Sequence, residues 1–73
     1  MSRAAVIGEG WRVEGFALAG AVVYPAEDEA AVRAAWHSLS SDVQLLIVTA
    51  KAAAWLAAEL TARPGLLPVV MPP

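Results

Sequence analysis

The sequence contains no cysteine, a single histidine and few charged residues. The absence of cysteine excludes disulfides and thiolate chemistry, and it is compatible with a reducing compartment. Charged residues make up 16% of the chain, whereas soluble domains average about 25%. The net charge is -2 and the five basic residues are scattered, so no basic stripe is present to neutralise a nucleic-acid backbone. Nucleic-acid binding is therefore not expected.

Long apolar runs are also missing. The longest, such as residues 45–48, are far shorter than the roughly 20 residues that span a bilayer, and we see no secretion signal. We expect no direct insertion into a membrane. Hydrophobic residues nevertheless make up 59% of the 73 residues. Because so small a chain buries only about 60% of its surface on folding, the remaining apolar area is either meant for a protein partner or consists of surface alanines.

Hydrophobic periodicity predicts four strands separated by three helical segments. The expected strands are residues 4–7, 21–24, 43–48 and 66–71, and the expected helices lie within 9–19, 29–37 and 50–62. Three helical crossovers imply a parallel sheet, and right-handed connections place helices on both of its faces. The predicted architecture is a single receiver-like α/β domain over residues 1–73, with a small doubly wound four-stranded sheet of order 2-1-3-4.

Local signals mark the ends of these elements. Asp28 and Thr49 are predicted N-caps, because their side-chain oxygens can accept a hydrogen bond from a free N–H of the first helical turn. Pro64 and Gly65 are predicted to end the third helix. Pro68 has no N–H to donate and therefore predicts that the last strand lies at an edge of the sheet.

In a doubly wound sheet a ligand would bind where the strand order reverses, between the first and third strands. Gly8 and Gly10 do not fit the dinucleotide fingerprint there, because Gly15 follows five residues after the second glycine instead of three. A phosphoacceptor receiver needs clustered acids to hold a divalent cation, and this sequence has only Glu9, with Thr49 after the third strand. We therefore predict no catalytic, cofactor-binding or metal-binding residues. Binding of a nucleotide in a pocket near Gly8 and Thr49 stays open as a less favoured hypothesis.

The other polar candidates have simple explanations. Glu9 and Glu14 are expected to be solvated, since neither has an obvious second carboxylate for acid–base catalysis. His37 is expected near the end of a helix, where exposure or the helix dipole accounts for it. Lys51 is either a surface lysine or a side chain that faces an anion at the switch point.

Three tryptophans occur in this short chain, and Trp is favoured at the hot spots of interfaces. Trp36 falls on the apolar stripe of its helix and is predicted to be core. Trp11 lies in a turn, and Trp55 lies beside the apolar face of the third helix. For these two residues half-buried packing and partner contact both stay open.

The motif AVIG at residues 5–8, followed by an acid, and the motif GFxLAG at residues 15–20 resemble the F subunit of the V-type and A-type rotary ATPases. The resemblance covers nearly the whole chain. It implies a receiver-like domain that binds the coiled-coil D subunit in the central rotor stalk, which couples ATP turnover to ion transport. It also implies an accessory subunit without an active site of its own, cytoplasmic and attached to the membrane through the complex.

Two features of the sequence depart from the family pattern. The chain stops at Pro73, before the C-terminal helix that the family usually carries, and Ala50 follows Thr49 where an acid is common. The candidate partner contacts are Gly15, Phe16, Leu18, Trp11 and Trp55. The alternative hypothesis is a degenerate receiver-like module that binds a different protein or forms a homodimer.

Overall fold

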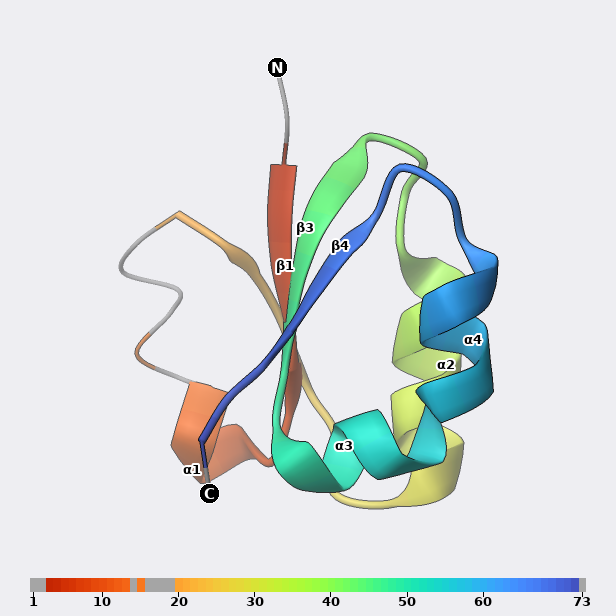
Figure 1. Ribbon diagram of the computed structural model, residues 1–73. Helices are drawn as coiled ribbons and strands as arrows, with labels where there is room; N and C mark the ends of the chain where they lie inside the picture. Colours follow the sequence, from red (N-terminus) through yellow and green to blue (C-terminus); the bar gives the residue numbers. More distant parts are fainter. Residues whose placement is uncertain (1–2, 14, 16–19, 73) are drawn as a thin grey trace.

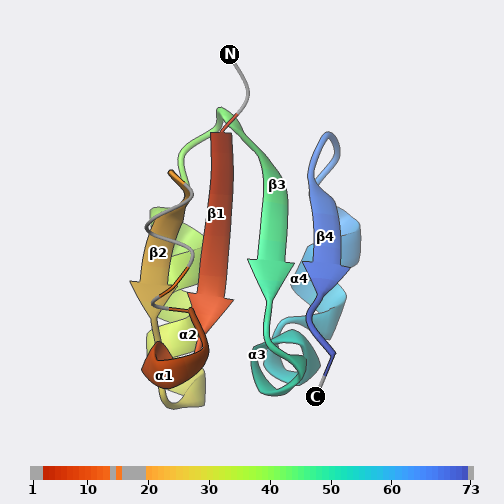
Figure 2. The ribbon, with the colours of Figure 1, turned by 90° about the vertical axis from the view of Figure 1, so that its left-hand side faces the viewer.

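A four-stranded parallel sheet forms the centre of the computed structural model, which describes residues 3–13, 15 and 20–72. The strands are β1 (Arg3–Gly8), β2 (Val22–Pro25), β3 (Val43–Val48) and β4 (Leu67–Val70). They are hydrogen-bonded in the order β2-β1-β3-β4, and all three pairs are parallel (Figures 1 and 2). The predicted α/β class and strand order are confirmed.

The helices lie on both faces of this sheet, as right-handed crossovers require. They are α1 (Gly10–Val13), α2 (Glu29–Ser38), α3 (Ala50–Trp55) and α4 (Ala57–Ala62). Helices α2, α3 and α4 cover one face, whereas α1 lies on the other, against β1 and β2 (Figures 1 and 2). The two faces are therefore covered unequally by the described elements.

The main hydrophobic core fills the space between the sheet and helices α2–α4. The two central strands contribute Ala5, Ile7, Leu46 and Val48, and the helices contribute Val32, Ala35, Ala52 and Leu56. In the register of β1 and β3, Ile7 pairs with Val48, so both side chains point to the same face. Val6 and Val13 are also fully buried but lie outside this cluster. They belong to the face that carries α1.

Side-chain caps begin the two helices for which caps were predicted. Asp28 Oδ1 accepts a hydrogen bond from the N–H of Ala31 at 2.8 Å. Thr49 Oγ1 accepts one from the N–H of Ala52 at 3.4 Å. Both predictions are confirmed, and each cap satisfies a donor that the helix itself leaves free.

The helix predicted within residues 9–19 is observed only as the single turn α1. Of residues 14–19 the structure describes Gly15 alone, so most of that prediction lies outside the described residues. Gly20 has φ +87°, a left-handed conformation that glycine adopts without steric cost. This conformation precedes β2.

The prediction of one continuous helix over residues 50–62 is wrong, because the helix breaks at Leu56. Its backbone has φ -106° and ψ 11°, and its N–H donates to the carbonyls of both Ala52 and Ala53, at 3.1 and 3.2 Å. The Leu56 side chain is fully buried. Burial of this leucine in the core accompanies the break, and α4 restarts at the next residue.

Arg33 of α2 connects the two halves of the broken helix. Its Nη2 donates to the Trp55 carbonyl at 3.0 Å, at the end of α3, and its Nη1 donates to Glu59 of α4. Its Nε donates to Glu29 Oε2 at 3.0 Å. The hydrogen bonds to Glu29 and Glu59 raise the pKa of Arg33 above its usual value. The guanidinium is partly exposed, so it contributes more to the geometry of the break than to stability.

Strand β4 forms one edge of the sheet, as Pro68 predicted. The N–H of Met71 donates to the Val48 carbonyl at 2.8 Å, and successive N–H groups of a strand point to opposite sides. The missing N–H of Pro68 therefore falls on the free edge, where no strand partner needs it. This placement also removes a donor that another strand would need to extend the sheet.

We predict a large difference between two leucine truncations. Leu56→Ala removes a fully buried side chain and should lower the free energy of unfolding by about 2–5 kcal/mol. The matched control is Leu67→Ala, at a side chain that is 62% exposed, which should change it by no more than about 0.5 kcal/mol. Urea denaturation followed by circular dichroism measures both. Similar losses for the two variants would contradict the described core.

Candidate functional site

The strand order reverses between β1 and β3, and the residues that follow these two strands meet there (Figure 2). Thr49 comes directly after β3 and is fully buried. Its hydroxyl donates to Glu9 Oε1 at 2.7 Å and accepts the N–H of Ala52. The hydroxyl thus has both a donor and an acceptor partner. Glu9 is half-buried, and it is not the freely solvated carboxylate that its sequence position predicted.

Gly8 lies directly against the Thr49 side chain. A Cβ added to Gly8 would lie 2.2 Å from Thr49 Cγ2 and 2.6 Å from Thr49 Oγ1, well inside contact distance. The backbone on each side is paired, since the Gly8 carbonyl accepts the N–H of Ala26 at 2.8 Å and the Thr49 N–H donates to Ile7 at 3.2 Å. This glycine therefore allows two chain segments to pack closely, and the space beside it is filled by threonine.

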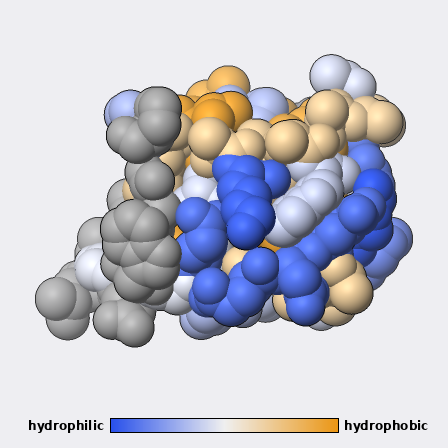
Figure 3. All heavy atoms as spheres, turned by 90° about the horizontal axis from the view of Figure 1, so that it is seen from below, coloured by the Kyte–Doolittle hydropathy of each residue, from blue (hydrophilic) through white to orange (hydrophobic). Residues whose placement is uncertain are grey.

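Gly10, the first residue of α1, donates its N–H to Glu27 Oε2 at 2.7 Å. A phosphate group in this position would compete with that carboxylate and would lie near the carboxylate of Glu9, both negatively charged. Seen from below, hydrophilic side chains gather at this end of the sheet (Figure 3). The geometry argues against the nucleotide hypothesis, because the groups that would bind phosphate are already paired with acids or threonine.

Other ligands find little support in the part of the chain that the structure describes. No three His, Asp or Glu side chains converge there as a possible metal site. None of the helices described is long and apolar enough to cross a bilayer. Glu14, which was predicted to be solvated, lies outside the described residues.

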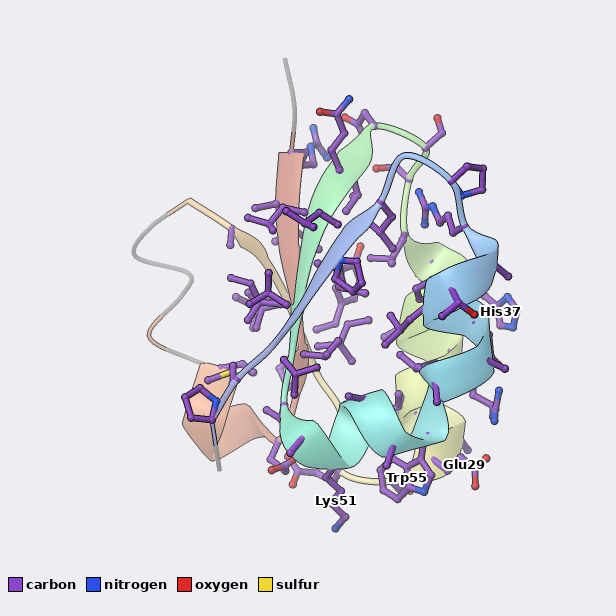
Figure 4. All side chains as sticks on the ribbon, in the orientation of Figure 1. Glu29, His37, Lys51 and Trp55 are labelled. Carbon is purple, nitrogen blue, oxygen red and sulfur yellow. The ribbon has the colours of Figure 1, made fainter. Side chains whose placement is uncertain are left out.

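The aromatic and basic candidates of α3 lie together. Trp55 is half-buried and packs against the main core. Lys51 is exposed, and its Nζ lies 5.5 Å from the centroid of the Trp55 ring, within the range of a cation–π contact. Both residues project from the lower end of the structure (Figure 4). Lys51 is thus a surface lysine that covers an aromatic ring.

Of the five predicted partner contacts, the structure describes Gly15, Trp55 and the backbone of Trp11. Trp11 belongs to α1, on the opposite side of the sheet from Trp55. Gly15 is exposed, and a Cβ there would meet no atom within 4 Å. The Trp11 side chain, Phe16 and Leu18 lie outside what the structure describes.

An open hollow of about 330 Å³ lies between the ends of α2 and α4, lined by Trp36, Glu59, Ala62, Arg63 and Pro64. Trp36, predicted to be core, is only partly buried. The Arg63 guanidinium lies 5.8 Å from the Trp36 ring centroid, and its Nη2 donates to the Ser40 carbonyl at 2.7 Å. The aromatic ring of Trp36 and the guanidinium of Arg63 are therefore already engaged in contacts within the chain. His37, on the last turn of α2, is exposed and points outward (Figure 4).

A second surface was not predicted from the sequence. The β3–β4 strip consists of Leu45, Ile47, Leu67 and Val69, which face away from α2–α4. Leu67 is 62% exposed and Val69 is 43% exposed, while Leu45 and Ile47 are half-buried. The sequence predicted helices on both faces of the sheet, but among the described elements only one face of β3 and β4 is covered by helices. Strand periodicity alone cannot show whether another element lies above a face.

We predict that Gly8→Ala destabilises the fold, because the new Cβ must displace Thr49. Overpacking of this kind costs about 1–3 kcal/mol. The matched control is Gly15→Ala, whose Cβ meets no atom within 4 Å and whose backbone φ is not positive. Thermal denaturation should show a lower midpoint for Gly8→Ala only. Equal midpoints for the two variants would contradict the close contact of Gly8 with Thr49.

Comparison with known proteins agrees with the motifs and the fold. No curated protein matches the chain closely. The family model of the ATP synthase (F/14-kDa) subunit matches residues 4–72, a stretch that contains nearly all of the sheet and every helix described above. The resemblance inferred from residues 5–8 and 15–20 is thereby confirmed. Since the match spans nearly the whole chain, this protein belongs to the ATP synthase (F/14-kDa) subunit family.

Proposed function

We propose that the chain is a non-catalytic F subunit in the central rotor stalk of a V/A-type rotary ATPase or ATP synthase. In this role it binds the coiled-coil D subunit and helps to couple ATP turnover to ion transport. The observation that carries the proposal is the family match over residues 4–72. Membership in this family places the chain with an ATPase complex, and the stalk position and the D partner are the parts that need a test.

The residues at the switch point between β1 and β3 support a non-catalytic role. Thr49 and Glu9 are bonded to each other, where a phosphoacceptor domain would direct its acids to a cation. Gly8 is packed under Thr49, and the Gly10 N–H is paired with Glu27. A receiver-like fold whose usual ligand position is filled by its own side chains is suited to binding proteins.

The proposed subunit acts mechanically. A rotor component transmits torque only if its core does not yield, and here the central strands β1 and β3 form a hydrophobic core with helices α2–α4 on one face of the sheet. We propose that residues 1–73 act as one domain that turns with the stalk and adds stiffness and contacts to it. Attachment to the membrane is then indirect, through the rest of the complex.

Partner contacts within this proposal start from Gly15, Phe16, Leu18, Trp11 and Trp55. Of these, Trp55 has a half-buried indole beside Lys51, and Gly15 lies open on the surface. Trp11 belongs to α1 and Trp55 to α3, which lie on opposite faces of the sheet.

We predict that co-expression with the cognate D subunit yields a complex that elutes as one peak in size-exclusion chromatography. The control is a coiled coil of similar length and net charge from an unrelated protein, which should elute separately. Separate elution of the cognate D subunit would overturn the stalk assignment. A tight dimer in light scattering, together with no affinity for D, would instead support the degenerate receiver-like module.

A further inference from the structure

The β3–β4 strip is an exposed apolar surface on the face of the sheet opposite α2–α4. Its positions follow from strand register, since Leu45 pairs with Leu67 and Ile47 pairs with Val69. The alternate residues Leu46 and Val48 belong to the main core, so the strip must face the other way. Two of the three large hydrophobic side chains that are exposed in the described residues, Leu67 and Val69, lie on it.

The type of sheet indicates what would cover this strip. Parallel sheets occur almost always with helices on both faces. Here α2–α4 cover one face, and on the other α1 lies against β1 and β2 (Figure 2). Among the described elements no helix lies over β3 and β4 on that face, so a helix is the element expected to cover it. A helix is about 10 Å across. Two neighbouring strands lie about 4.8 Å apart, so the helix and the pair of strands have similar widths.

Addition of a strand at the free edge is disfavoured. Pro68 has no N–H, and its nitrogen points to that edge, because the N–H of Met71 points to β3. A strand placed beside β4 would therefore lack one hydrogen bond in the middle of a four-residue ladder. The partner must contact the face of the strip, through side chains.

The area of the strip argues against a second copy of this chain. Four residues of strand extend over about 13 Å, so two such strips packed together would bury on the order of a few hundred Å² per partner. Stable interfaces bury about 800 Å² per partner. A longer helix that crosses the strip and continues along neighbouring surface can reach that area, whereas a symmetric contact through the strip alone cannot.

Negative charge at one end of the strip would favour one orientation of a partner helix over the other. The strip itself is uncharged, and the edge of the sheet at which β3 and β4 end also carries the carboxylates of Glu9, which follows β1, and Glu27, which follows β2. Lys51 at the same edge is directed to Trp55. A helix with an apolar stripe, and with Lys or Arg where it passes this edge, is complementary to both features.

We propose that the β3–β4 strip docks an amphipathic helix of the coiled-coil stalk partner, with its apolar stripe on Leu67 and Val69 and its basic residues near Glu9 and Glu27. The inference rests on the proposed function and names the surface that serves it. It assigns the contact to the sheet face opposite α2–α4, and thus to residues other than Trp55.

Two neighbouring valines provide a matched test. Val69 lies on the strip and is 43% exposed, whereas Val70 is 52% exposed and pairs with Val48 of the core side. Val69→Glu should weaken binding to the D subunit at least about tenfold, because the partner would have to bury an unpaired carboxylate. Val70→Glu should change it by less than about threefold. Isothermal titration with the purified D subunit measures both, with thermal midpoints as the check on folding.

Each result decides a separate question. If the unaltered chain does not bind the D subunit, the proposed function is overturned. If the chain binds and the two valine variants bind alike, the function stands and the docking surface is overturned. A dimer of the chain that Val69→Glu dissociates would also overturn it, since the occupant would be a second copy. Leu67→Glu, at the most exposed position of the strip, replaces Val69→Glu if that variant does not fold.

Discussion

The Thr49 side chain joins three parts of the molecule, and the centre of the fold depends on it. Its hydroxyl caps α3 and bonds Glu9 after β1, while its methyl group packs against Gly8 at a distance that no other residue type at position 8 would permit. Thr49 is also fully buried, so any loss of these bonds would leave polar groups unpaired in the interior. The switch point of the sheet is thereby closed with the chain's own atoms.

The unequal coverage of the sheet follows from its topology. With strand order 2-1-3-4, only the first crossover falls on one face, and the later two fall on the other. The later segments are well packed, since Arg33 joins α2 to both halves of the broken helix and Leu56 enters the core between them. The first crossover contributes the short helix α1 beside β1 and β2. The same rule that forms a good core on one side therefore leaves β3 and β4 open on the other.

These two properties fit a subunit of a larger machine. A small chain with 59% hydrophobic residues cannot bury all of its apolar surface by itself, and among the described residues the large hydrophobic side chains that are exposed all lie on β4. The free edge of β4 carries Pro68, which limits uncontrolled strand pairing, while the adjacent side chains stay available. Membership in the ATP synthase (F/14-kDa) subunit family supplies a complex in which such a surface can be covered.

Much of the fold was determined by the sequence itself, because its signals are local. Asp28 and Thr49 cap their helices through bonds to residues three positions away, and Pro68 restricts its own strand to an edge. The alternation of helical and strand periods was enough for the strand order, since the right-handedness of the crossovers leaves few arrangements.

Tertiary structure alone decided the features that depend on distant residues. The break at Leu56 accompanies burial in a core formed by other segments, Glu9 is held by a threonine 40 positions away, and the exposure of Leu67 and Val69 depends on which elements lie above them. Periodicity shows that a side chain is apolar and which way it alternates, but burial is a property of the neighbours that the whole fold brings near.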